Sequence, residues 1–455
     1  MKDTLHQKFN FATTLSLVVG VVVGIGIFFK TTPVLEKSGM NPNIAIAAWI
    51  LGGVVSIIAG LTAAELGARF TKTGGIVAYG EHIYGRKVGF IFGFVQSILY
   101  GPAINAALAF YFALFTCQFL NITPTLLPLL IISVVSICFT AAINIFSAKL
   151  GGWIQQGATY IKLIPLIVII IASFLYQPES SVVIDNTPIV VNNSPWFLTI
   201  GAALLPVLFT FDGWLFVGTI TKEIKNASKV LPLAIVGGLG IISLIYALIN
   251  IGLLNAFSPL QIVNTGIFGL SEILFGKMGS KFVTLAIVIS AYGGLNGYTI
   301  YSQRMLYSLA INDLFIGNKF LGKVNKKLNS PVNSALTMLG IILIYLSLIF
   351  LLPNNGDFSV NADLFTDIPV ATIWILYTLI FTGVIILRHR EPDAQLTYRV
   401  PLYPLLPIIA ILTGVFVVIN AIISNIPYFI LTMFLTIICF IIFLILDHQK
   451  TKKTI

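Results

Sequence analysis

The feature that most constrains the fold is a series of apolar runs, most of them about 20 residues long, that short polar segments separate. A helix of this length crosses the hydrocarbon core of a bilayer. Only 9% of the residues are charged, whereas soluble domains have about 25%, so the chain cannot cover a water-exposed surface with polar groups. Since a lipid-exposed span must satisfy its own backbone hydrogen bonds, each run is predicted to be a helix.

Short polar segments divide the apolar runs into twelve predicted transmembrane helices. They lie near 11–36, 43–68, 88–120, 126–148, 152–176, 196–221, 231–254, 281–311, 333–352, 370–387, 402–424 and 428–447. The predicted fold class is therefore an all-α polytopic membrane protein. Residues 1–455 are expected to form one membrane domain embedded in the lipid bilayer.

The distribution of basic residues predicts the orientation. If the N-terminus is cytoplasmic, most of the 26 lysines and arginines fall in cytoplasmic segments, and the outer loops 177–195 and 353–369 contain none. The basic residues expected outside are Lys30, Lys37, Lys277 and Lys281. This is the positive-inside pattern, and an odd number of spans would destroy it, so both termini are predicted to be cytoplasmic. A net charge of +10 then reflects the anionic inner leaflet and requires no nucleic-acid partner.

Chemistry-bearing residues do not gather as an enzyme or a metal site would require. The cysteines have no CxxC spacing, and the four histidines do not converge with cysteines or carboxylates. We therefore expect no metal, no cofactor and no enzymatic activity. The longest segment between spans, roughly 25 residues, is too short for the independent soluble core of a sensor domain.

Two of the predicted spans are interrupted near the bilayer centre. Gly24 and Gly26 make the backbone of the first span flexible, and Pro206 precedes an Asp212–Gly213 pair in the sixth. Interruptions at equivalent positions of two halves indicate a transporter built from inverted repeats. The freed N–H groups at a broken helix start can hold a carboxylate, and the freed carbonyls at a broken helix end can hold an ammonium.

Few ionisable residues are expected at membrane depth. Lys162 lies near the middle of the fifth span, where it should pair with carbonyls or a carboxylate and have a function. Asp212 has two interpretations, a functional carboxylate or a cap for the broken half of the sixth span. Glu65 lies nearer the inner end of its span and suggests a gating or anchoring charge. Lys30 is expected to be a solvated lysine at the outer end of the first span.

Five separated motifs resemble a known family. They are GIGIFFKTTPVL (24–35), AAELGARFTKTGGIVAYGEHIYG (63–85), FDGW (211–214), YGGLNGYTIYSQRMLYSLA (292–310) with SPVNSAL (330–336), and YRVPLYPLLP (398–407). In this order they resemble the amino acid–polyamine–organocation (APC) superfamily and, within it, the L-type amino acid transporter branch. The match runs through nearly the whole chain.

The resemblance implies a five-plus-five inverted repeat, the LeuT-like or APC fold, with discontinuous helices 1 and 6. The first repeat would be 11–176, the second 196–387, and two trailing helices would occupy 402–447. An α-amino acid would bind between the two discontinuous helices. Its carboxylate would meet the N–H groups of Ile25, Gly26 and Ile27, and its ammonium would meet carbonyls near Val22, Val23, Phe209, Thr210 and Asp212.

The resemblance also implies roles outside these direct contacts. Phe209 aligns with the aromatic residue that closes over the substrate from outside. Lys162 matches the fifth-span lysine of sodium-independent members, whose ammonium stands where sodium-coupled relatives hold an ion and links spans one, five and eight. Ser290 and Asn296 in span eight, with Glu65, complete the predicted gating and coupling residues.

The implied function is sodium-independent transport of neutral L-amino acids, small or larger, across the plasma membrane, by exchange with alternating access. Proton-coupled symport, with Lys162 or a neighbouring carboxylate titrating, stays open. So does antiport of cationic amino acids or amines, since Asp212 could receive a positive side chain. Leu215 replaces an asparagine common in animal members, which puts recognition of large side chains through that contact in doubt. The surroundings of Cys117 match the animal outer-loop cysteine poorly, so no heavy-chain glycoprotein partner is expected. Ile- and Lys-rich usage suggests a bacterial source.

Overall fold

The computed structural model describes a chain that is almost entirely helical. The described residues are 10–24, 26–70, 75–147, 161–177, 195–215, 224–312, 317–325, 330–353, 356–396 and 398–424, with isolated residues between and after these ranges. Eight helices in them are long and apolar enough to cross a membrane. The predicted class of polytopic helical membrane protein is therefore confirmed. Three shorter apolar helices lie within the first, fifth and sixth predicted spans.

The helices follow one another in this order. They are α1 (Phe11–Val22), α2 (Gly26–Lys37), α3 (Pro42–Arg69), α4 (Gly75–Tyr84), α5 (Arg86–Phe94), the π-helix η1 (Val95–Tyr100), α6 (Gly101–Leu120), α7 (Leu126–Phe146), α9 (Leu163–Leu175), α10 (Trp196–Thr210), α11 (Ala227–Ala256), α12 (Pro259–Ile311), α13 (Asn318–Leu321), α14 (Val332–Leu351), α15 (Phe358–Arg390) and α16 (Leu405–Ser424). The helices α5, η1 and α6 form one continuous span over Arg86–Leu120.

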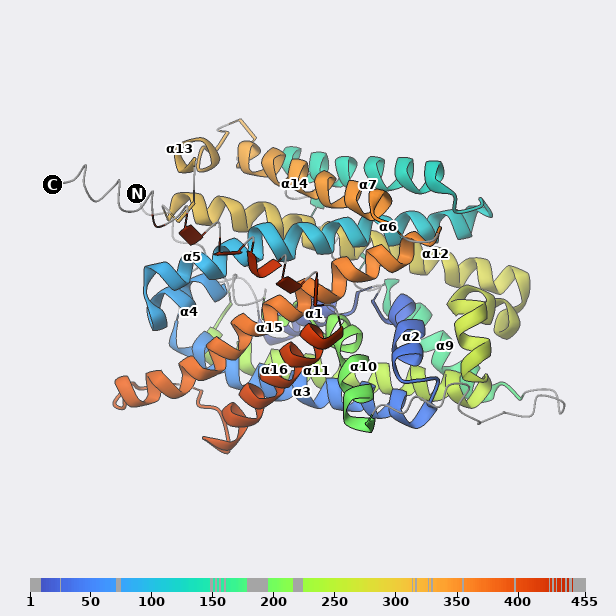
Figure 1. Ribbon diagram of the computed structural model, residues 1–455, viewed down its shortest axis with the longest axis horizontal. Helices are drawn as coiled ribbons and strands as arrows, with labels where there is room; N and C mark the ends of the chain where they lie inside the picture. Colours follow the sequence, from blue (N-terminus) through green and yellow to red (C-terminus); the bar gives the residue numbers. More distant parts are fainter. Residues whose placement is uncertain are drawn as a thin grey trace.

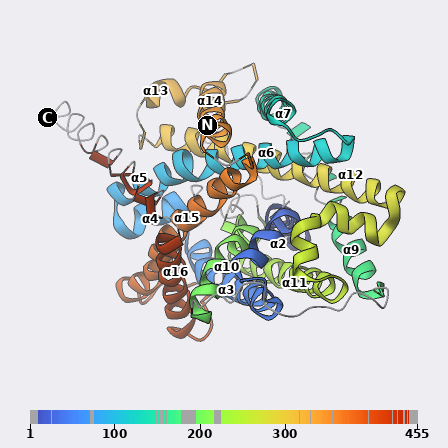
Figure 2. The ribbon, with the colours of Figure 1, turned by 45° about the vertical axis from the view of Figure 1, so that its right-hand side comes forward.

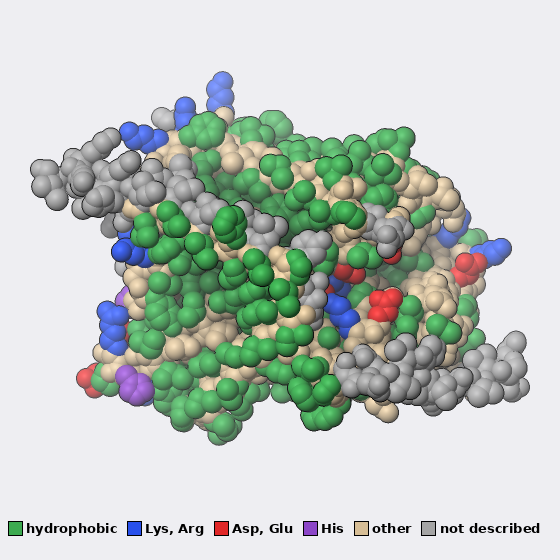
Figure 3. Space-filling model, viewed as in Figure 1, with side chains coloured by type: hydrophobic (Ala, Val, Ile, Leu, Met, Phe, Trp, Pro, Cys, Tyr) green, Lys and Arg blue, Asp and Glu red, His purple; other side chains and the backbone are tan. Residues whose placement is uncertain are grey.

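The helices gather in two groups. The helix α3 packs against α10 and α11, and α11 also packs against α1. The second group contains α6, α7, α12 and α14, while α15 crosses between the groups and contacts both α3 and α6 (Figure 1). The turned view keeps the same two groups and places α2 between them (Figure 2). The space-filling view shows a broad hydrophobic surface with charged side chains mainly toward its left and right ends, as a bilayer requires (Figure 3).

The predicted interruption of the first span is confirmed. The helix α1 ends at Val22 and α2 begins at Gly26. Between them Val23 leaves the helical conformation, with ψ of 87°, and the N–H of Gly24 turns back to the carbonyl oxygen of Val22 at 2.7 Å. Ile25, the residue between Gly24 and Gly26, lies outside the described residues.

The sixth predicted span also stops being helical at the predicted position. The helix α10 ends at Thr210, four residues after Pro206. Gly213 follows with φ of +97°, a conformation that favours glycine because a side chain would clash there. The rest of this predicted span, residues 216–223, lies outside the described residues.

Two of the long helices begin well before their predicted spans. The helix α12 begins at Pro259 rather than 281, after the hydroxyl of Ser258 caps the N–H of Gln261, and it bends at Gly266 and Gly276, which have positive φ. The helix α15 begins at Phe358 rather than 370, where Asp357 caps the N–H of Ser359. Side-chain caps start both helices ahead of their apolar stretch. The short helices α4 and α13 lie between predicted spans and were not predicted.

Candidate substrate-binding site

The two interrupted helices meet at Gly26. A Cβ atom added to Gly26 would lie 2.9 Å from Thr210 Cγ2 and 3.1 Å from Phe209 Cε1, so the first residue of α2 touches the last turn of α10. The N–H groups of Gly26 and Ile27 belong to the first turn of α2, which has no intrahelical acceptors and carries the positive end of the helix dipole. This start of α2 offers donors of the kind that bind a carboxylate.

Carbonyl groups of both broken helices converge on one tyrosine. The hydroxyl of Tyr246, from α11, lies 3.5 Å from the carbonyl oxygen of Val22 and 3.4 Å from that of Thr210. A hydroxyl has one proton, so it cannot donate fully to both oxygens. The carbonyl of Thr210 therefore retains acceptor capacity for an additional donor such as an ammonium, and the carbonyl of Val22, which also accepts the N–H of Gly24 at 2.7 Å, has its second lone pair to share. Val23 is fully buried beside them.

Sequence reasoning missed Tyr246. Its ring is fully buried and packs edge-on against Trp49 and Phe211, at centroid distances of 5.8 and 5.1 Å. The signal in the sequence was a single tyrosine within the aliphatic run ISLIYALINIG, where a buried hydroxyl needs a partner.

The carboxylate of Asp212 is buried and accepts three hydrogen bonds. Tyr100 donates to Oδ2 at 2.5 Å, Tyr377 donates to Oδ1 at 2.8 Å, and the N–H of Gly213 donates to Oδ1 at 2.8 Å. The bond from Gly213 fits the interpretation of Asp212 as a local cap. The two tyrosines go further, because they join the end of α10 to η1 and to α15. Tyr100 is the last residue of the π-helix, an element that often marks functional sites.

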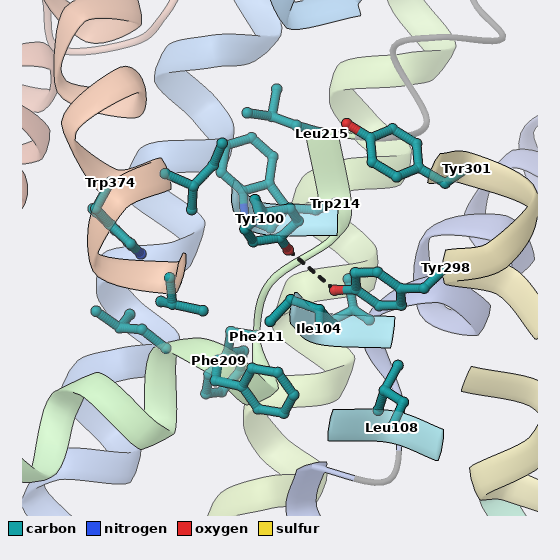
Figure 4. Close-up of a cluster of buried hydrophobic side chains, with 14 of the residues drawn as sticks. Tyr100, Ile104, Leu108, Phe209, Phe211, Trp214, Leu215, Tyr298, Tyr301 and Trp374 are labelled. Atoms are coloured by element: carbon teal, nitrogen blue, oxygen red, sulfur yellow. Dashed lines mark hydrogen bonds between the residues drawn. The ribbon is translucent and has the colours of Figure 1, made fainter. Parts of the chain in front are cut away.

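Aromatic side chains surround this carboxylate. The hydroxyls of Tyr100 and Tyr298 point toward each other, 3.2 Å apart, with Phe209 and Phe211 on one side of them and Trp214 and Leu215 on the other (Figure 4). The ring centroids of Trp214 and Tyr377 are 5.7 Å apart. Phe209 and Leu215 are each 7% exposed. These side chains of η1, α10, α12 and α15 thus pack into a mostly apolar cluster around Asp212.

Lys162 finds the carbonyl partner that its burial requires. Its side chain is fully buried, and Nζ donates a hydrogen bond to the carbonyl oxygen of Gly20 in α1. The bond joins the fifth predicted span to the first. The lysine side chain therefore contacts α1 two residues before that helix ends.

The two predicted residues of span eight lie in α12 and are fully buried. The side-chain amide of Asn296 donates to the carbonyl oxygen of Gly151 at 3.0 Å and accepts from Asn144 at 2.8 Å. These bonds join α12 to α7 and to the segment after it. The hydroxyl of Ser290 has no hydrogen-bond partner among the described residues.

The expectation for Lys30 was wrong. Instead of a solvated lysine, it is completely buried and forms ion pairs with Asp363 and Asp367 of α15, at 2.7 and 2.8 Å. The helix α2 turns this side chain inward, and the start of α15, which was not predicted to be helical, supplies both carboxylates.

Glu65, four residues before the end of α3, forms an ion pair with α15. Arg388 of α15 donates to its two carboxylate oxygens at 2.9 and 2.6 Å, and the N–H of Val400 adds a bond of 2.7 Å. Beyond the end of α15, Glu391 contacts Arg69 and lies 3.3 Å from His82. Desolvation opposes the charged form of Glu391, but the contacts with His82 and Arg69 outweigh it and hold the pKa of this carboxyl below its usual value.

Metal ligands do not gather in the part of the chain that the structure describes. Its His, Cys, Asp and Glu side chains form no group of three or more that could hold a metal ion. Cys117 is a buried free cysteine, and Cys439 lies outside the described residues. The candidate site therefore rests on backbone groups, hydroxyls and aromatic rings.

Comparison with known proteins agrees with this geometry. A family model described as amino acid permease matches residues 9–446. The serine/threonine exchanger SteT of Bacillus subtilis (strain 168) is 34% identical over 92% of each chain. The mouse b(0,+)-type amino acid transporter 1 is 25% identical over 93% of this chain and 84% of its own, and the human cystine/glutamate transporter is 24% identical over 88% and 78%.

These matches confirm the family resemblance found in the sequence motifs. They span the interrupted helices, the aromatic residues around Asp212 and the ion pairs at both ends of α15. The chain belongs to the amino acid permease family, and it is a membrane transporter of amino acids rather than an enzyme.

Proposed function

We propose that this transporter exchanges neutral L-amino acids across the plasma membrane without sodium. Small hydroxyl-bearing amino acids are the first candidates, because the relative from Bacillus subtilis is named a serine/threonine exchanger. The proposed architecture has twelve spans with both termini in the cytoplasm. Residues 11–176 and 196–387 form the inverted repeats, residues 402–447 form the trailing helices, and alternating access moves the repeats around the substrate.

The observation that carries the proposal is the meeting of two broken helices at Gly26. The start of α2 supplies N–H donors for a carboxylate, and the carbonyls of Val22 and Thr210 supply acceptors for an ammonium. Every α-amino acid has these two groups. In our proposal Ile25 adds a third N–H donor, Val23 and Asp212 add backbone carbonyls, and the aromatic ring of Phe209 closes the site from outside.

The hydrogen bonds of Asp212 favour neutral over cationic substrates. Its carboxylate already accepts from Tyr100, Tyr377 and Gly213, so three of its four acceptor sites are filled by the protein. A positive side chain would have to share the last site with them, and displacing a buried tyrosine hydroxyl to gain a second would cost about 1–3 kcal/mol. Leu215 adds apolar surface beside Trp214 (Figure 4).

The position of Lys162 supports sodium independence. Its ammonium already donates to a carbonyl of α1, which is the kind of oxygen ligand that a coupling cation would need. Ser290 and Asn296, buried in α12, would complete the coupling region. The burial of the free Cys117 thiol supports function without a disulfide-linked heavy chain.

The proposal is tested with purified protein in liposomes that are preloaded with serine or left empty. We expect uptake of labelled serine to rise at least about tenfold with preloading, to be the same in sodium and choline buffers, and to compete with threonine and alanine but not with arginine or glutamate. If an imposed pH gradient drove uptake into empty liposomes, the proposed exchange mechanism would have to be replaced by proton symport. Strong competition by arginine would contradict the argument from Asp212.

A further inference from the structure

A fully buried lysine lies on α2 outside the contacts proposed for the substrate. The Nζ atom of Lys30 donates to Asp363 at 2.7 Å, to Thr366 at 2.6 Å and to Asp367 at 2.8 Å. An ammonium has three protons, so these three acceptors on α15 use all of them. An ammonium buried without partners would cost several kcal/mol. The observed position of Lys30 is therefore favourable only while α2 and α15 stay together.

Two more side chains extend this cluster to a third helix. Lys37, at the end of α2, donates to the other oxygen of Asp367 at 2.6 Å. Tyr111 of α6 donates to Asp363 at 2.8 Å. We call the six residues the outer latch: Lys30, Lys37, Tyr111, Asp363, Thr366 and Asp367. The outer latch fastens α2 and α6 to the first turns of α15. Figure 3 shows acidic and basic side chains grouped right of centre on an otherwise hydrophobic face.

The outer latch also touches the aromatic residue that faces Gly26. The Nζ atom of Lys30 lies 5.4 Å from the ring centroids of both Phe29 and Phe209, within the range of a cation–π interaction. Phe29 in turn stacks on Tyr111, with centroids 3.7 Å apart and planes at 16°. Lys30 thus joins the carboxylates of α15 directly to the ring of Phe209 on α10.

Water has a route to one side of this cluster. A cavity of about 380 Å³ is lined by Phe29, Thr32, Glu36, Tyr111 and Asp363, among others. The side chain of Asp363 is 25% exposed, whereas those of Lys30 and Asp367 are 0% and 4% exposed. If α2 moved away from α15, the charges would enter this cavity and recover hydration as they lost each other. Hydration would therefore offset part of the free energy that the charges lose when they separate.

We propose that Lys30 is a positioning residue that holds the outer side of the transporter closed, by fastening α2 to α15 above Phe209. The proposal rests on the alternating access proposed above. Replacing Lys30 by methionine leaves Asp363 and Asp367 facing each other with only Lys37 to compensate them. That penalty falls on the closed arrangement, because the open arrangement hydrates both carboxylates. The substitution should therefore shift the population toward the arrangement that is open to the outside.

The test measures how fast a membrane-impermeant methanethiosulfonate labels a cysteine at Thr32, which lines the cavity. The full-length parent carries Thr32→Cys with Cys117, Cys138 and Cys439 replaced by alanine. We expect Lys30→Met to raise the labelling rate about tenfold, which corresponds to about 1.4 kcal/mol. Lys30→Arg should stay near the parent rate. The matched control is Lys277→Met, an equal loss of charge at an exposed lysine of α12 that lines a separate cavity.

A parental labelling rate in Lys30→Met, or an equal acceleration in Lys277→Met, would overturn the proposal. If Lys30→Met fails to fold, Asp363→Asn tests the proposal instead, because it removes one carboxylate at constant size. This variant should raise the labelling rate about threefold. The double variant Lys30→Met/Asp363→Asn restores the charge balance and should label near the parent rate. A purely structural effect would make the double variant worse than either single one. Labelling is done without substrate, so failure of serine exchange would count against the proposed function and leave this result standing.

Discussion

Replacing Gly26 by alanine tests the placement of the substrate most directly. The added Cβ would lie 2.9 Å from Thr210 Cγ2 and 3.1 Å from Phe209 Cε1, closer than side chains tolerate without movement. Inserting a methyl group into a tight site costs about 1–3 kcal/mol. The clash with Thr210 and Phe209 also exists without substrate and should lower the Tm of the unbound variant. A further cost falls on the bound state, because the substrate carboxylate must share the same space at the start of α2.

The magnitude can be worked through for a cost of about 2 kcal/mol, which weakens the affinity about 30-fold. A substrate at 100 times its Kd stabilises the parent protein by about 2.7 kcal/mol. At the same concentration, Gly26→Ala would be at about 3 times its Kd and would gain about 0.9 kcal/mol. The rise in Tm with serine should therefore fall to about a third, and Gly26→Val should abolish it.

The assay is thermal unfolding of purified protein in detergent, with and without saturating serine. Gly24→Ala is the matched control, because a Cβ there would meet only Val22 O at 3.9 Å and Gly26 N at 4.0 Å. The control should keep the full shift with serine. If Gly26→Ala also kept the full shift, the substrate carboxylate would lie elsewhere.

Three further substitutions probe the remaining contacts. Lys162→Ala should reduce serine exchange at least about tenfold while the protein stays monodisperse in detergent, because the carbonyl of Gly20 in α1 loses its buried lysine partner; unchanged kinetics would remove Lys162 from the mechanism. Tyr246→Phe should raise the KM for serine about fivefold with kcat nearly constant, since it removes one weak hydrogen bond and keeps the ring contacts; an unaltered KM would exclude the hydroxyl from the site. Glu65→Gln should lower the free energy of unfolding by about 3 kcal/mol, because Arg388 loses its bidentate partner. The control Arg390→Gln, at a nearby exposed position, should leave the Tm unchanged. Equal effects of the two substitutions would contradict the anchoring role of Glu65.

The sequence predicted the spans best where apolar residues alone decide them. The helices α3, α7, α11 and α14 begin and end within a few residues of the predicted runs, because the hydrocarbon core sets their length. The starts of α12 and α15 were missed for the opposite reason. Ser258 and Asp357 begin these helices through side-chain caps, in polar sequence that no hydropathy pattern distinguishes from a loop.

The parts of the candidate site that could be predicted are those where a residue determines its own backbone conformation. Glycines 24 and 26 and the Asp212–Gly213 pair marked the two interruptions, since their effect is local. Tyr246 and the partners of Lys30 could not be found in this way. Lys30 and Asp363 are separated by 333 positions, and only the crossing of α2 and α15 brings them into contact. A lysine beside an outer loop therefore looked solvated until the fold supplied its carboxylates.

The helix α15 makes polar contacts near its start, at its middle and near its end. In the proposed alternating access, these contacts can explain why the outer and inner sides are not open at the same time. Asp363 and Asp367 meet Lys30 at its start, Tyr377 meets Asp212 at its middle, and Arg388 meets Glu65 near its end. A helix of 33 residues transmits a tilt at one end to the other. If α2 leaves α15 when the outer side opens, the bond between Arg388 and Glu65 can still fix α15 to α3. Substrate bound beside Asp212 would then act on the middle contact, where a small shift of Tyr377 changes the balance between the two ends.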